Sequence, residues 1–210
     1  MRIRIDPDQL TVAPGVPAHF AVTVFNTSAI IQAFRIRLTG LVVPVDVIAA
    51  PAQLGLFPET EGTAAVSFTL PRDFPAGLHT ATVEVTGTVS NEDDGHATGP
   101  QTGTVTAPLN LLVEPVYDAA VALEPQSVTA GKRAKYTVVA ENRGNVPLTM
   151  ALVATDGEQA LRFRFAAHEI TVPPGRRVRA AMQAKGKRPF LGTPKPRIVT
   201  VRATAPQALP

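Results

Sequence analysis

The sequence predicts an all-β protein made of two consecutive β-sandwich domains. Three observations support this fold class. Apolar and polar residues alternate in many short segments, which is the periodicity of a half-buried strand. The 210 residues include 20 Pro and 15 Gly, which interrupt these segments and oppose long helices. A pattern of residues also occurs twice, 116 positions apart, which indicates two copies of one unit.

The first strands of each copy carry this repeat. Each copy begins with a short segment that contains a proline, at 5–7 and at 123–125. A turn with a glycine follows, and then a strand of alternating apolar and polar residues that ends at an asparagine. Val12, Gly15, Ala18, Phe20, Val22 and Asn26 correspond at this spacing to Val128, Gly131, Ala134, Tyr136, Val138 and Asn142. Their constant offset predicts the same strand, turn and strand in both copies.

The next segments keep the same order in both copies. An alternating strand begins near Phe34 in the first copy and near Leu148 in the second. A Pro-marked corner follows at 57–58 and at 172–175, and another alternating strand comes after each corner. These segments predict equivalent hairpins in the two copies.

The clearest strand covers residues 80–89, where Ala and Val face one side and Thr and Glu the other. Its counterpart is expected at Val199 and Val201, again 116 positions on. About seven short strands per hundred residues, with frequent turn signals, are typical of an immunoglobulin-like sandwich. The sequence therefore predicts two tandem immunoglobulin-like β-sandwich domains.

The predicted domains are residues 1–114 and 115–210, joined at Glu114-Pro115 by a short, semi-rigid linker. The first domain carries 5 Lys and Arg against 11 Asp and Glu, and the second carries 15 against 6. The first is therefore acidic and the second basic, although the whole chain has a net charge of only +3. This asymmetry directs the search for a binding surface to the second domain.

Three stretches of the second domain resemble bacterial immunoglobulin-like modules of the CARDB type and those associated with α-galactosidases. They are Ala-Glu-Asn-Arg-Gly-Asn-Val-Pro-Leu at 140–148, the segment 154–165 and Val-Pro-Pro-Gly at 172–175. The resemblance implies the sandwich fold and a place in large actinobacterial proteins of unassigned role. Relatives of this kind often continue into a membrane-spanning helix.

The sequence offers little that points to catalysis. It has no Cys, and His19, His79, His96 and His168 show no metal-ligand spacing. Hydrolase and phosphate-loop motifs are missing too, so we expect no enzyme activity, no cofactor and no metal site. The acidic cluster at 91–96 has the oxygen ligands that calcium prefers, but a solvated hairpin loop is the favoured interpretation.

Basic residues concentrate near the end of the second domain. The spacing places them on a sheet edge and in the loop that follows it. They attract anions, or alternatively they keep an exposed edge from pairing with other chains. The candidate partner-binding residues are Arg176, Arg177, Arg179, Lys185, Lys187, Arg188, Phe190, Lys195 and Arg197.

These features favour a non-catalytic interaction, scaffold or spacer module. The preferred partner is an acidic protein surface or a multi-protein assembly, with an anionic membrane surface as the second choice. Nucleic acid is disfavoured because Phe190 is the only stacking aromatic in the basic loop, and a small-molecule substrate is disfavoured by the missing chemistry. Phe25, Phe190 and Leu191 are further candidate protein contacts.

A carbohydrate-binding module of the cell envelope is the alternative function. The chain has no Trp, and Tyr136 alternates toward the core, so the exposed aromatic platform of such modules is weak. The polar start of the chain does not resemble a signal peptide, which predicts a cytoplasmic location. Membrane association is expected only if the natural chain continues past Pro210.

Overall fold

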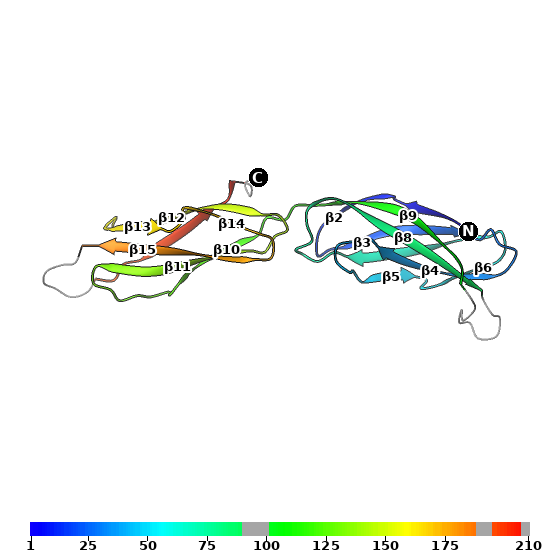
Figure 1. Cartoon of the computed structure of the whole chain (residues 1–210), viewed down its shortest axis with the longest axis horizontal. Coiled ribbons are helices and arrows are strands. Elements are labelled where there is room, and N and C mark those ends of the chain that lie inside the picture. Colours follow the sequence, from blue (N-terminus) through cyan, green and yellow to red (C-terminus); the bar gives the residue numbers. More distant parts are fainter. Residues whose placement is uncertain (90–100, 188–194, 207–210) are drawn as a thin grey trace. The chain divides into compact units, whose positions relative to one another are not determined.

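The computed structural model describes residues 1–89, 101–187 and 195–206. The chain divides into two compact units, Met1–Pro115 and Val116–Pro210, here called unit 1 and unit 2. Each unit is a sandwich of two β-sheets (Figure 1). The predicted all-β, tandem-sandwich class is therefore confirmed. No helix long and apolar enough to cross a membrane occurs among the described residues.

Unit 1 contains two sheets, called A and B. Sheet A has the strand order β1-β3-β7-β5, and sheet B has the order β2-β9-β8-β4-β6. All neighbours are antiparallel except the parallel pair of β2 and β9. The strands are β1 (Arg2–Asp6), β2 (Gln9–Val12), β3 (Pro17–Phe25), β4 (Gln32–Thr39), β5 (Val47–Ala50), β6 (Leu54–Leu56), β7 (Glu61–Thr69), β8 (Gly77–Val89) and β9 (Gln101–Val113).

Unit 2 repeats this plan with sheets C and D. Sheet C has the order β10-β11-β15-β13, and sheet D has the order β14-β12-β16. All of these pairs are antiparallel. The strands are β10 (Ala119–Glu124), β11 (Arg133–Asn142), β12 (Leu148–Asp156), β13 (Leu161–Phe165), β14 (Glu169–Val172), β15 (Arg177–Gly186) and β16 (Val199–Thr204).

Strand register confirms the internal repeat. Phe20 of β3 lies opposite Val66 of β7, and Tyr136 of β11 lies opposite Met182 of β15, with both partners displaced by the same 116 positions. The pairing of β4 with β6 recurs at this offset as the pairing of β12 with β14. Residues of sheets A and C can therefore be compared one by one.

One predicted equivalence is wrong by two residues. Leu38 of β4 lies opposite Val83, whereas Ala154, its counterpart in β12, lies opposite Val201. Val201 is therefore the counterpart of Val83, at an offset of 118 rather than 116. A shift of two residues preserves which side chains face the core, so the alternation pattern alone does not reveal it.

Each unit encloses its own apolar core. Phe34, with 0% exposure, is among the largest side chains buried between sheets A and B. Met150 of β12 takes the corresponding place in unit 2, together with Leu148 on the same strand, and Tyr136 of β11 packs against this cluster. The predicted inward alternation of β3 and β11 is thus confirmed.

A buried asparagine ties the two sheets of each sandwich together. In unit 1, Asn26 follows β3 of sheet A, and its Nδ2 donates to the carbonyl of Leu56 in sheet B at 3.1 Å. In unit 2, Asn142 ends β11 of sheet C, and its Nδ2 donates to the carbonyl of Val172 in sheet D at 2.9 Å. Each Nδ2 also donates to the carbonyl four residues further along the chain, at 2.9 and 2.8 Å. Both side chains are completely buried.

The turn after Asn142 anchors the first residues of unit 2. The Val116 N–H donates to Oδ1 of Asn145 at 2.6 Å, and the Val116 carbonyl accepts from the Asn145 N–H at 3.2 Å. The Arg143 N–H donates to the Asp118 carbonyl at 2.8 Å. A Cβ on Gly144 would collide with the Val116 carbonyl, so this position requires glycine.

Asn142→Ala is expected to lower the free energy of unfolding of unit 2 by about 2 kcal/mol, because it leaves buried backbone carbonyls without a donor. Urea unfolding of the full chain, followed by amide exchange in β11 and β12, measures this loss. Asn110→Ala is the control, because the Asn110 side chain is exposed and its amide oxygen accepts from the Thr80 hydroxyl at the surface. Equal stability of the two variants would contradict the bridging role.

Gly144→Ala is expected to destabilise unit 2 by about 2 kcal/mol, because the anchored segment must move to admit the methyl group. Gly157→Ala provides the matched control, since a Cβ there has open space around it. Melting temperatures of the two variants give the comparison. A Gly144→Ala protein as stable as its control would show that the turn does not hold Val116 in place.

Candidate anion-binding face

β15, which carries Arg177 and Arg179, lies between β11 and β13 in sheet C. It pairs with β11 along Arg177–Lys185 but with β13 only along Met182–Gly186. Lys185 therefore lies between two strands and not at a sheet edge, whereas the part of β15 with Arg177 and Arg179 pairs with β11 alone among the described residues. Protection of an exposed edge cannot explain the charge of Lys185, because strands pair with it on both sides.

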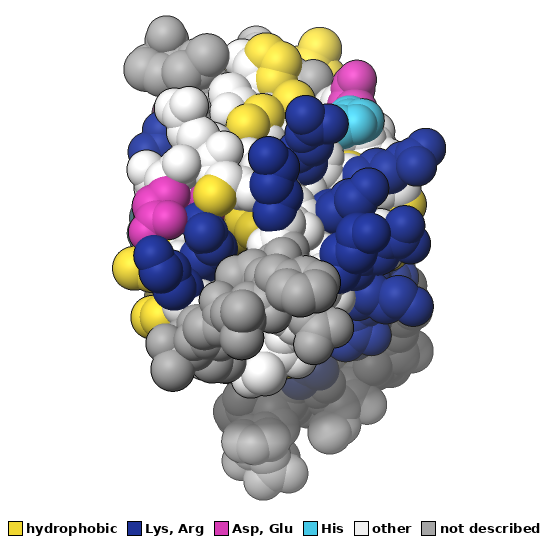
Figure 2. Space-filling model, turned by 90° about the vertical axis from the view of Figure 1, so that its left-hand side faces the viewer, with side chains coloured by type: hydrophobic (Ala, Val, Ile, Leu, Met, Phe, Trp, Pro, Cys, Tyr) yellow, Lys and Arg dark blue, Asp and Glu magenta, His cyan; other side chains and the backbone are white. Residues whose placement is uncertain are grey.

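Cations gather on the outward side of sheet C, across three neighbouring strands. Lys185 of β15 lies opposite Arg133 of β11 on one side and opposite Arg162 of β13 on the other. Lys135 and Arg164 occupy the next row, and Arg179 lies further along β15. Figure 2 shows Lys and Arg side chains gathered on one face of the molecule. We call Arg133, Lys135, Arg162, Arg164, Arg179 and Lys185 the cationic face.

Within the part of the chain that the structure describes, no side chain of the cationic face forms an ion pair. The nearby acid Glu141 is engaged by other cations. Arg177 donates to it at 2.9 Å and Arg143 at 3.0 Å. These two hydrogen bonds hold the pKa of Glu141 below its ordinary value, Arg177 contributing most. Glu141 therefore pairs with Arg177 and Arg143, and not with a residue of the cationic face.

An open hollow of about 510 Å³ lies among these side chains. Lys135 and Arg164 line it from neighbouring rows, together with the small side chains of Thr137 and Ala181. Glu124 is the one acid in the lining. The hollow can admit an anionic side chain that two cations contact together.

Unit 1 has the same sheet without these charges. Each residue of the cationic face has an equivalent 116 positions earlier in the sequence. For Arg133, Lys135, Arg162, Arg164, Arg179 and Lys185, the equivalents are, respectively, Pro17, His19, Asp46, Ile48, Thr63 and Thr69. None of them is Lys or Arg, yet sheet A forms with the same register. The fold therefore does not require the cationic face, and like charges directly opposite each other oppose folding.

The structure separates the sequence-predicted residues into several groups. Arg179 and Lys185 belong to the cationic face, and Arg177 is paired with Glu141. The exposed residues Arg176, Lys187 and Lys195 lie outside the strands. Arg188, Phe190 and Leu191 lie outside the described residues, as does the cluster at 91–96.

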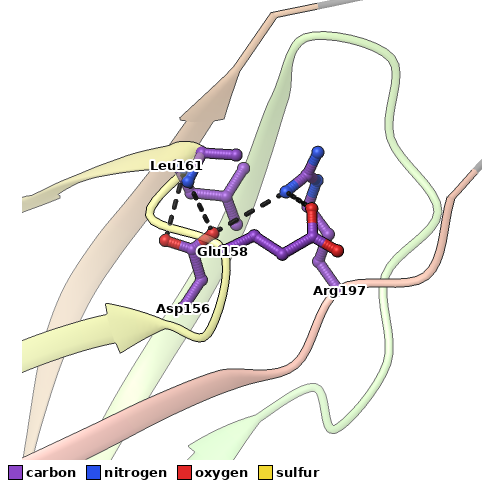
Figure 3. Close-up of polar contacts among 5 residues, drawn as sticks. Asp156, Glu158, Leu161 and Arg197 are labelled. Atoms are coloured by element: carbon purple, nitrogen blue, oxygen red, sulfur yellow. Dashed lines mark hydrogen bonds and ion pairs between the residues drawn. The ribbon is translucent and has the colours of Figure 1, made fainter.

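Arg197 has a local structural role. Its guanidinium lies 2.9 Å from a carboxylate oxygen of Glu158 and 3.8 Å from one of Asp156 (Figure 3). Asp156 is buried and accepts N–H groups of Ala160 and Leu161 at 2.9 and 3.3 Å. Arg197 therefore stabilises the turn between β12 and β13 and is not a free cation.

Sequence reasoning missed Arg133, Lys135, Arg162 and Arg164. A local signal was present, because Arg133 and Lys135, like Arg162 and Arg164, alternate with residues that face the core. Alternation places each pair on the outward side of its strand. Only the pairing of both strands with β15 brings the two pairs together.

The described residues contain no group of three or more His, Asp or Glu side chains placed to hold a metal ion. Two histidines have aromatic neighbours instead. His79 contacts the Phe74 ring and the carbonyl of Pro75, and His168 contacts the Phe165 ring. The cationic face offers anion binding by charge and hydrogen bonding.

No protein-family model matches the chain, and no curated protein matches it. Among solved structures, the CsuC–CsuE chaperone–tip adhesion subunit complex of Acinetobacter baumannii matches with a TM-score of 0.43 and 11% identity, over 93% of this chain and 97% of that chain. A protein of unknown function from Porphyromonas gingivalis W83 matches with a TM-score of 0.37 and 17% identity, over 88% of this chain and 83% of that chain. The E. coli chaperone DraB matches with a TM-score of 0.37 and 13% identity, over 85% of this chain and 83% of that chain. The resemblance to CARDB-type modules stays a prediction.

Lys185→Thr, which introduces the residue found at the equivalent position of unit 1, is expected to stabilise unit 2 by about 0.5 kcal/mol. The reason is that Lys185 lies between Arg133 and Arg162, and like charges opposite each other on a sheet are destabilising. Urea unfolding at low salt measures the gain, and Lys132→Thr is the control outside the strands. A loss of stability specific to Lys185→Thr would show that the fold depends on this cation.

Proposed function

We propose that this chain is a non-catalytic protein-interaction module whose unit 2 binds an acidic protein surface through the cationic face. One observation carries the proposal. The cationic face has six Lys and Arg side chains without ion pairs within the described chain, at positions that unit 1 fills with other residues. Charges that a fold does not need, and that weaken it, are best explained by a ligand of opposite charge.

The geometry suits a carboxylate-rich surface. Neighbouring strands lie about 4.8 Å apart, and same-face residues along one strand about 6.8 Å apart, so the cations form a grid on a rigid support. Arg162 and Arg164 can each hold a carboxylate through two parallel N–H groups. A sheet loses little conformational entropy on binding, which favours affinity.

The other residues of this side of sheet C favour a protein over a nucleic acid or a membrane. Thr137, Val139, Ala181 and Gln183 fill the positions between the cations. None is aromatic, whereas binding of single-stranded nucleic acid normally adds stacking side chains. The same positions lack the large apolar side chains that insert into a lipid interface.

The test compares two variants that lose the same charge. The first, Lys135→Gln with Arg164→Gln and Arg179→Gln, removes the centre of the cationic face. The second, Arg2→Gln with Arg4→Gln and Arg35→Gln, removes three exposed cations of unit 1. We expect the first variant to bind fluorescent polyglutamate at least about tenfold more weakly than the parent, and the second to bind like the parent. Parent binding should weaken as salt is raised from 50 to 300 mM, roughly as Debye screening predicts.

Equal losses in the two variants would mean that net charge, and not the cationic face, attracts the probe. Vesicles containing phosphatidylglycerol and a single-stranded oligonucleotide provide competing ligands. Tighter binding of the parent to either one than to polyglutamate would contradict a protein partner.

A further inference from the structure

An open hollow of about 580 Å³ lies at one end of sheet A in unit 1. Pro17 begins β3 and Thr69 ends β7, and both line the hollow. Apolar side chains, including Pro44, Ile48 and Leu70, form most of the lining. The hollow therefore offers an apolar surface to a ligand.

The fold does not require this apolar surface. Ile48 of β5 is 68% exposed, and its register position is held in unit 2 by Arg164 of β13. Val16, which precedes β3, is 54% exposed, and the exposed Lys132 stands 116 positions later. A sandwich of the same register thus accepts Arg and Lys where unit 1 exposes Ile and Val. Apolar side chains that stay exposed without a need of the fold are typical of a binding surface.

Two opposite charges also line the hollow. Asp46 immediately precedes β5, and Arg72 follows the end of β7. Both side chains are exposed, and neither forms an ion pair within residues 1–89, 101–187 and 195–206. A ligand that complements the hollow therefore carries a base for Asp46 and an acid for Arg72.

The stem of Arg72 packs closely against the backbone of Gly15. Gly15 has a φ of +79°, and its N–H donates to the Leu70 carbonyl at 2.8 Å. A Cβ at this position would lie only 3.1 Å from Cγ of Arg72. Glycine therefore permits both the turn and the close approach of the arginine, which restricts the Arg72 stem beside the hollow.

We infer that the hollow of unit 1 binds an extended segment of a partner protein through one large apolar side chain. The segment has a basic residue on the side of Asp46 and an acidic residue on the side of Arg72. A small-molecule site normally encloses most of its ligand, whereas an open hollow covers one side only, as a docked side chain of a protein requires. The two charges fix the direction in which the segment lies.

This inference is independent of the proposed function, because the hollow belongs to unit 1 and the cationic face to unit 2. Ile48→Gln removes an apolar contact of the hollow without changing charge. It should therefore leave binding of polyglutamate unchanged. A failure of either proposal can thus be recognised separately.

The test selects phage-displayed random peptides of nine residues on the full chain and measures the affinity of the selected, labelled peptides by fluorescence anisotropy. We expect them to share a large apolar residue with a base on one side and an acid on the other. Ile48→Gln should weaken their binding at least about tenfold. Leu78→Gln is the matched control, because Leu78 is 76% exposed and does not line the hollow. Its protein should bind the peptides like the parent.

A charge exchange tests the orientation. The protein with Asp46→Lys and Arg72→Glu should bind a selected peptide at least about threefold more weakly and should prefer the peptide whose acid and base are exchanged. Selected peptides without a shared apolar residue, equal effects of Ile48→Gln and Leu78→Gln, or an unchanged charge preference would overturn the inference. Free leucine that binds as tightly as the peptides would overturn it too, since the ligand would then be a small molecule.

Discussion

A buried asparagine amide that bridges two sheets is the interaction on which each sandwich depends. Asn26 and Asn142 each reach the carbonyl of a strand in the opposite sheet, and the two accepting residues, Leu56 and Val172, are themselves 116 positions apart. A buried amide without partners would be costly, so this hydrogen bond fixes how the facing sheets approach one another. Because both units keep it, their residues occupy comparable positions, and differences between the units can be interpreted as functional.

One difference stands out in that comparison. Sheet C carries Lys and Arg at positions where sheet A has none, although the two sheets share one register. This difference changes charge and leaves the fold intact, which supports the proposal that unit 2 binds an acidic protein surface.

Local sequence patterns predicted the fold well and the binding face poorly. Alternation in β3 and β11 identified their core-facing residues because period two is a local property of a strand. The sequence pattern predicted Asn142 only as the end of a strand, because the carbonyl that it binds belongs to β14, far along the chain. Arg133 and Arg162 were missed for the same reason, because they become neighbours only through Lys185 of β15. The offset of 118 at Val201 was hidden because a two-residue shift leaves the alternation unchanged.

The central claim is that the cationic face serves binding and not folding. It is tested most directly by thermal unfolding of a variant in which Lys135, Arg162, Arg164, Arg179 and Lys185 become His, Asp, Ile, Thr and Thr, the residues of unit 1. Melting with and without polyglutamate compares stability and binding in one measurement, because a ligand of the folded state raises the melting temperature. The account predicts a variant at least as stable as the parent that no longer responds to polyglutamate. A variant that melts several degrees lower, or that keeps the full response of the parent, would contradict it.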